Sequence, residues 1–208
     1  DAYVRFIKQN SDHPMFEPIT IEEFRDEVLA NGYDLGPIYG SQWRNYNGDG
    51  IDQLSEALRL IKEEPWSRRI KVYGANPSQV KNQTLPPCHD SFQFNVRDKH
   101  LDLKFTMRST DVGLGLPFNL AFYGLMLHHF CYLTRLNPGK LIFDGGDVHI
   151  YEDHVEALQR QVAREPLAPP MMLSRIDNRP KHLDDYTVNK YKIFGYVSHP
   201  TIKMKQSF

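Results

Sequence analysis

A cysteine between two prolines and a histidine stands in the run Leu85-Pro86-Pro87-Cys88-His89. The thiolate form of cysteine is a strong nucleophile, and proline restricts the backbone that leads to it. Further along the chain come an anion-binding pair, Arg108 and Ser109, and a carboxamide, Asn119. The sequence therefore gathers a nucleophile, an anion clamp and a carboxamide, the groups that covalent addition to a nucleotide base requires.

Cys88 on its own would not establish a nucleophile, because a lone cysteine in a globular protein is more often buried and unreactive. A neighbouring arginine raises the thiolate fraction, and Arg108 is the candidate for that position. His89 could polarise the surroundings of the thiol. We therefore interpret Cys88 and His89 as catalytic candidates. The other cysteine, Cys131, lies in an apolar run and is interpreted as a small buried residue.

Four groups are suited to binding a phosphate monoester: Arg68, Arg69, Arg108 and Ser109. The rigid donor fork of arginine matches such a dianion better than the point charge of lysine does. An Arg-Arg pair is more often a solvated surface feature, and this alternative stays open for Arg68 and Arg69 when they are considered alone.

Asn119 is the candidate for reading the base. Its carboxamide has one donor and one acceptor edge and so matches N3–H and O4 of uracil, whereas an aspartate would suit the amino group of cytosine. The sequence therefore favours a uracil nucleotide. Asn119 could also be a helix N-cap, because it follows Pro117-Phe118 at the start of an apolar segment.

Apolar periodicity predicts the elements that must position these groups. Helical spacing from Ile51 to Ile61 predicts an amphipathic helix that ends before Pro65. Period-two alternation predicts an antiparallel hairpin with Cys88 at its mouth. Its strands are 92–96 and 101–105, and the other predicted elements are helices over 119–133 and 151–164 and a strand over 191–197. Together they predict an α+β fold, a mixed β-sheet with a long buried central helix on one face.

The composition is that of one soluble domain, which we expect to span residues 1–208. The chain has 25 basic and 26 acidic residues, so no excess positive charge supports nucleic acid binding. No apolar run reaches the roughly 20 residues that span a bilayer, and no signal-peptide pattern opens the chain, so we expect no membrane association. Cys88 and Cys131 are the only two cysteines, and counting alone leaves a disulfide between them open, but we expect reduced thiols in the cytoplasm.

From residue 34 to Phe208 the sequence resembles the thymidylate synthase family of folate-dependent pyrimidine C5 transferases. The resemblance rests on motifs in the family's order, which are 34–40, Ser67-Arg68-Arg69, the Pro-Cys-His run, 107–111, 116–119, 145–151 and 199–204. It implies a transferase of nucleotide biosynthesis, a methyltransferase or a hydroxymethyltransferase with 5,10-methylenetetrahydrofolate as cosubstrate. We expect no metal, because the histidines have no metal-ligand spacing with a cysteine.

The resemblance also implies roles for individual residues. Cys88 would attack C6 of the pyrimidine, and Arg68 and Arg69 would reach the phosphate in the neighbouring subunit, which implies a homodimer with shared active sites. The phenol of Tyr39 would line the site near the cysteine, and Ser109 would form part of a pocket that accepts deoxyribose. His149 and Tyr151 would hydrogen-bond the sugar 3'-hydroxyl, and Asp111 would bind the pterin ring.

The family's N-terminal portion, with an Arg-containing phosphate loop and a glutamate that organises water, is expected to be absent from the chain. A loose match of residues 3–7 places Ala2 where that glutamate belongs. The chain is then either part of a longer protein or divergent at its start.

Several residues favour a hydroxymethyl product. The family places tryptophans around the folate, but 20–24 carries none, Ala75 replaces another, and 205–208 ends the chain with polar residues. Met107 before Arg108 is similar to the run in nucleotide hydroxymethylases. Water would then capture the C5 methylene, because solvent exclusion sets the product. We therefore expect dUMP to become 5-hydroxymethyl-dUMP. The alternatives are a thymidylate synthase that makes dTMP and a non-catalytic nucleotide-binding homologue.

Overall fold

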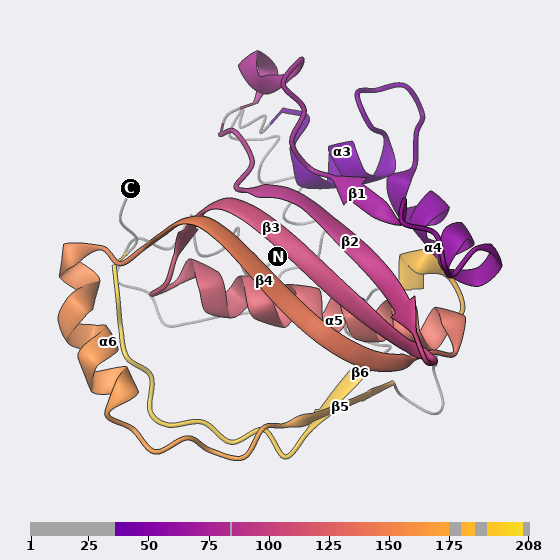
Figure 1. Ribbon diagram of the computed structural model, residues 1–208. Helices are drawn as coiled ribbons and strands as arrows, with labels where there is room; N and C mark the ends of the chain where they lie inside the picture. Colours follow the sequence, from indigo (N-terminus) through magenta and orange to yellow (C-terminus); the bar gives the residue numbers. More distant parts are fainter. Residues whose placement is uncertain (1–35, 84, 175–179, 186–190, 206–208) are drawn as a thin grey trace.

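The computed structural model describes residues 36–83, 85–174, 180–185 and 191–205. A four-stranded sheet in the order β1-β2-β3-β4 carries a long helix, α5, across one face (Figure 1). These elements are β1 Lys71–Tyr73, β2 His89–Arg97, β3 His100–Asp111, β4 Asn137–His149 and α5 Gly115–Thr134. This arrangement confirms the predicted α+β class with a mixed sheet and a central helix.

The sheet is mixed because its strands follow two pairing modes. β2 pairs with β3 as an antiparallel hairpin, in which Phe92 faces Phe105, and β3 pairs with β4 in parallel. A parallel pair needs a long crossover connection, and α5 supplies it. The last residues of β3 and β4 therefore lie side by side at one edge, where Asp111 is paired with His149.

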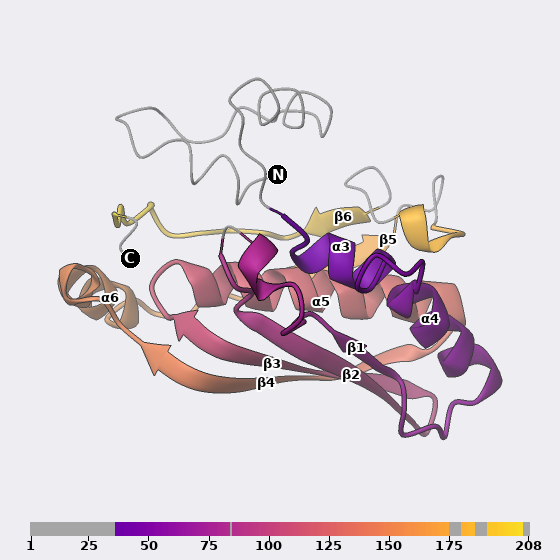
Figure 2. The same ribbon diagram turned by 90° about the horizontal axis from the view of Figure 1, so that it is seen from above.

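The remaining elements flank this unit. On the β1 side lie α3 and α4, and α5 lies between the sheet and a second pair of strands, β5 and β6 (Figure 2). Their bounds are α3 Tyr39–Arg44, α4 Gln53–Glu63, α6 Val155–Val162, β5 Met171–Ser174 and β6 Tyr191–Phe194, with 3-10 turns at Val80–Asn82, Glu152–His154 and Leu183–Asp185. Within the described ranges, the helices are too short or too polar to cross a bilayer.

Several predicted boundaries need correction. The central helix begins at Gly115, four residues before the predicted start, and the helix predicted over 151–164 is a 3-10 turn followed by α6, which ends at Val162. The strand predicted over 191–197 ends at Phe194. The long strand β4 was not predicted at all.

The core is an aromatic layer between α5 and the hairpin. Tyr123 is completely buried, and its ring stacks on Phe105 with centroids 4.1 Å apart. Phe94 of β2 stacks in the same way on Phe130, with centroids 4.5 Å apart. These stacked pairs fix the position of the helix on the sheet, since aromatic pairs add to the free energy gained by burying their area.

Replacing Phe94 tests this coupling. Phe94→Ala removes a fully buried ring from the interface between sheet and helix, so the free energy of unfolding should fall by about 3 to 5 kcal/mol. Urea denaturation measures this change. Val162→Ala, at a position that is 81% exposed, is the control and should change it by less than about 0.5 kcal/mol. Equal effects of both substitutions would contradict the packing described.

Candidate active site

Most of the predicted site residues meet at the edge where β3 and β4 end. Cys88 directly precedes β2, whose first residue pairs with Met107 of β3. Arg108 and Ser109 follow in β3, and Ser109 is paired with Asp147 of β4. Asp111 and His149 are the last residues of their strands, Tyr151 comes just after β4, and Asn119 lies in the first turns of α5.

The backbone of Cys88 is held on both sides. Its N–H donates to Tyr39 Oη at 3.2 Å, and its carbonyl accepts from the Arg108 N–H at 2.9 Å. The residue itself is only partly buried. The backbone of Cys88 is therefore fixed at a partly exposed position, and the phenol of Tyr39 lies beside it.

The guanidinium of Arg108 lies against the loop that carries the cysteine. Nε donates to the Pro87 carbonyl at 2.9 Å, and Nη2 donates to the Pro86 carbonyl at 2.7 Å. Nη1 has no acceptor among the described residues. The same side chain therefore holds the loop in place and keeps a donor for an anion.

His89 is partly buried beneath the site and is uncharged at neutral pH. Burial lowers its pKa to about 4. Its Nδ1 lies 2.9 Å from the hydroxyl of Tyr123, and the ring of Tyr39 meets it edge-on at 4.9 Å. Burial also raises the pKa of Tyr123, so that phenol keeps its proton. His89 therefore lies against Tyr123 as a neutral imidazole and contributes no positive charge.

Asp111 caps the start of α5. Its carboxylate accepts hydrogen bonds from the backbone N–H groups of Gly113, Leu114 and Gly115 at 2.9, 2.8 and 3.1 Å. Partial burial raises its pKa, but these hydrogen bonds outweigh that effect and hold the pKa below its ordinary value. Asn119 lies within the helix, so the alternative that it caps the helix is wrong.

His149 and Tyr151 form a second small cluster at this edge. Their rings meet edge-on with centroids 5.0 Å apart. His149 Nδ1 is buried, lies 3.6 Å from Asp147 Oδ1, and has no hydrogen-bond partner among the described residues. This nitrogen can form a hydrogen bond with a hydroxyl group of a ligand.

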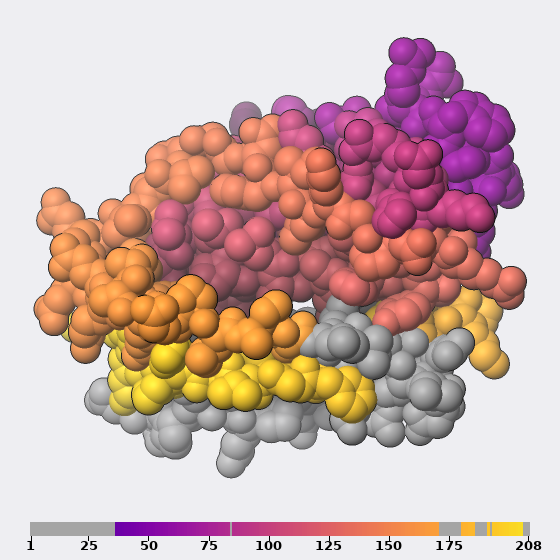
Figure 3. Space-filling model, turned by 60° about the horizontal axis from the view of Figure 1, so that its bottom comes forward, coloured from indigo at the N-terminus to yellow at the C-terminus, as the bar shows by residue number. Residues whose placement is uncertain are grey.

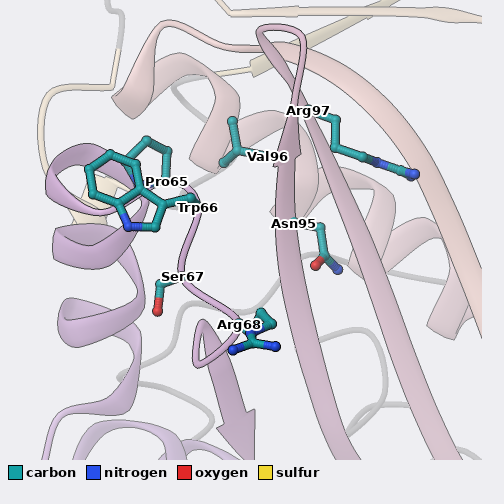
Figure 4. Close-up of a pocket in the computed structure, with 7 residues that line it drawn as sticks. All are labelled: Pro65, Trp66, Ser67, Arg68, Asn95, Val96 and Arg97. Atoms are coloured by element: carbon teal, nitrogen blue, oxygen red, sulfur yellow. The ribbon is translucent and has the colours of Figure 1, made fainter.

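Arg68 and Arg69 do not join the site within one chain. The carbonyl of Arg68 accepts from Gln93 Nε2 at 3.2 Å, and Gln93 lies roughly 13 Å along β2 from His89 at the usual strand rise. Arg68 instead lines a hollow at the far end of β2, together with Pro65, Trp66, Ser67, Asn95, Val96 and Arg97 (Figure 4). The residues of the predicted phosphate clamp therefore lie in two separate regions of the chain.

Two residues of this region were missed from the sequence. Tyr123 follows Asn119 by one helical turn, which puts both on one face of α5, and this spacing was the available signal. His154 was considered only as a metal ligand. Within the described ranges there is no cluster of three residues that could hold a metal ion.

Comparison with known proteins gives one consistent result. The family model described as thymidylate synthase matches residues 5–208. The thymidylate synthase of Francisella philomiragia is 42% identical over 187 residues, which cover 84% of this chain and 68% of the relative. That of Mycoplasma genitalium is 41% identical over 195 residues, covering 91% of this chain and 66% of the relative. The chain thus spans about two thirds of the length of these relatives.

The family match and these relatives identify the protein as a one-carbon transferase of pyrimidine nucleotides, as predicted. The chain belongs to the thymidylate synthase family, whose members use methylenetetrahydrofolate as cosubstrate.

The prediction of a hydroxymethylase is wrong, because the relatives at 41 to 42% identity are named thymidylate synthase. The structure gives a physical reason in the case of Met107. Its side chain is 2% exposed and packs in the core, where Thr110 Oγ1 donates to its sulfur at 3.5 Å, so it does not face the site. Ala2 and the segments 20–24 and 206–208 lie outside the described residues.

The partly buried His89 should make stability depend on pH. The pKa of His89 is about 4 in the folded protein, below the ordinary 6.5. Between these two pH values the unfolded chain binds more protons than the folded protein, so the free energy of unfolding decreases as the pH is lowered. When the pH is lowered from about 7 to about 5, the free energy of unfolding of the native protein should decrease by about 2 kcal/mol more than that of His89→Gln. Urea denaturation at each pH measures both decreases. The difference between the two proteins isolates His89, because His128 and His129 are shifted in the same direction. Parallel pH profiles would contradict this assignment.

Proposed function

We propose that this protein is a thymidylate synthase, which converts dUMP and 5,10-methylenetetrahydrofolate to dTMP and dihydrofolate. The observation that carries the proposal is the fixed backbone of Cys88, held between Tyr39 and Arg108 at a partly exposed position. The names of the relatives support the methyl product. Both cysteines are free thiols, which supports a reducing compartment such as the cytoplasm.

In the proposed reaction, the Cys88 thiolate adds to C6 of the pyrimidine, and C5 becomes a carbon nucleophile. C5 attacks the methylene carbon of the folate and then loses its proton. Tetrahydrofolate leaves, and an exocyclic methylene remains on C5. A hydride from tetrahydrofolate reduces this methylene to methyl and oxidises the folate to dihydrofolate. Breaking the C6–S bond then releases dTMP and the thiolate.

The other residues of the edge fit the two substrates. Asn119 would read N3–H and O4 of uracil, and it is available for this role because Asp111 already caps the helix. Arg108 and Ser109 would bind the phosphate. His149 and Tyr151 would bind the sugar 3'-hydroxyl, which the unpartnered Nδ1 of His149 supports. Asp111 would bind the pterin ring of the folate.

The proposed enzyme is a homodimer with shared active sites. Arg68 lies beside Gln93, well away from Cys88 of its own chain, and an arginine side chain does not cross that distance. Arg68 and Arg69 would instead complete the phosphate site of the neighbouring subunit. Sharing requires an arginine that does not reach the Cys88 site of its own chain, and Arg68 meets this requirement.

The activity is tested with dUMP and methylenetetrahydrofolate. The native protein should form dTMP and dihydrofolate in equal amounts, detected by mass spectrometry and by the dihydrofolate absorbance. Cys88→Ser should lower turnover by at least about a thousandfold, because an alkoxide forms far less readily than a thiolate. Cys131→Ser is the matched control and should stay active. A native protein that binds dUMP without turnover would instead be a non-catalytic homologue, and the proposal would fail.

Subunit sharing is tested by mixing inactive variants. When Arg69→Ala and Cys88→Ala subunits exchange, a hybrid dimer contains one site with both groups intact, so activity should return to about a quarter of native or less. The matched control mixes Arg108→Ala with Cys88→Ala. Both of those groups belong to one subunit's site, so no hybrid site is intact and no activity should return. If the first mixture stays inactive although exchange is verified, Arg69 does not cross the interface.

A further inference from the structure

His154 is completely buried in the 3-10 turn between β4 and α6. Its Nε2 lies 2.5 Å from the carbonyl oxygen of Lys205, and its Nδ1 lies 3.5 Å from Asp111 Oδ1. Gly113 packs so closely on the ring that a Cβ there would come within 2.6 Å of Nδ1. The imidazole therefore fills the space between the start of α5 and the last described part of the chain.

The contacts of the His154 ring determine which of its nitrogens carries a proton. A carbonyl oxygen only accepts, so Nε2 must carry a proton and donate it to Lys205. Nδ1 is buried and has no hydrogen-bond partner among the described residues. The ring of Tyr151 meets the imidazole edge-on with centroids 5.6 Å apart. His154 thus touches the C-terminal segment, Asp111 and Tyr151 at once.

The C-terminal segment reaches this point from the far side of the molecule. After β6 it runs back beside the segment that follows α6, as the yellow and orange bands of Figure 3 show. His199 Nε2 donates to the Glu165 carbonyl at 2.9 Å on the way. Two histidine-to-carbonyl hydrogen bonds, one from His199 and one from His154, therefore hold this segment in place.

We propose that His154 is a positioning residue that fixes the C-terminal segment, at Lys205, against Asp111 and Tyr151. The segment then lies over the side of the site that would bind the folate. The role in folate binding rests on the proposed function, whereas the tether itself does not. His154 acts through Lys205 and Asp111 and takes no part in bond making.

Hydrogen exchange of the substrate-free protein tests the tether. Glutamine places a donor near Nε2 and asparagine places one near Nδ1, so the two substitutions separate the two nitrogens. In His154→Asn, amides of residues 201–205 should exchange about five to ten times faster than in the native protein, because one hydrogen bond is lost. His154→Gln should exchange at nearly the native rate. His100→Asn is the control, because His100 lies at the exposed turn at the other end of β3. It should leave the exchange rates of the C-terminal amides unchanged.

The same variants test the role in the reaction. His154→Asn should raise KM for methylenetetrahydrofolate about five- to tenfold and change KM for dUMP less than that, and in His154→Gln the folate KM should stay near the native value. Equal behaviour of the two variants, or unchanged exchange in His154→Asn, would overturn the proposal. A native protein without turnover would overturn the proposed function alone, because the exchange experiment needs no substrate.

If a variant does not fold, a measurement on the native protein tests the His154 hydrogen bond instead. The nitrogen chemical shifts of His154, measured by NMR, should show a proton on Nε2 that exchanges slowly with solvent. A ring protonated on Nδ1 alone would leave two acceptors facing each other at Lys205 and would overturn the proposal.

Discussion

The packing of α5 on the hairpin through Tyr123 is the constraint on which the site depends. The ring of Tyr123 stacks on Phe105, and its hydroxyl lies 2.9 Å from Nδ1 of His89, the residue next to the proposed nucleophile, Cys88. Core packing and site geometry therefore share one side chain. Because Tyr123 is completely buried, a shift of α5 on the sheet would displace the support beneath Cys88.

The crossover from β3 through α5 to β4 adds the second constraint. It brings the ends of two parallel strands and the start of a helix to one edge, so Asp111 can cap α5 while paired with His149. Gly146 permits the close approach of the strands, since a Cβ there would meet the Arg108 carbonyl at 2.7 Å. Residues far apart in sequence thus meet because of one connection.

The sequence predicted the hairpin and the central helix because their apolar periodicity is local and strong. It did not predict β4, where glycines interrupt the alternation and the pairing partner is far away in the chain. The position of Cys88 followed from the hairpin. The capping by Asp111 and the distance between Arg68 and Cys88 depend on tertiary contacts, which no local pattern contains. Met107 was misread as a product signal because its burial could not be seen in the sequence.

The central claim is that Cys88 forms a covalent bond to C6 of the pyrimidine. Incubation with methylenetetrahydrofolate and 5-fluoro-dUMP tests it directly, because fluorine cannot leave C5 as a cation and the reaction stops with the C6–S bond intact. Peptide mass spectrometry should find the nucleotide and folate on the peptide that contains Cys88. Cys131, whose pKa burial raises to about 12, should stay unmodified. An adduct on another residue, or an unmodified protein that still turns over dUMP, would contradict the account.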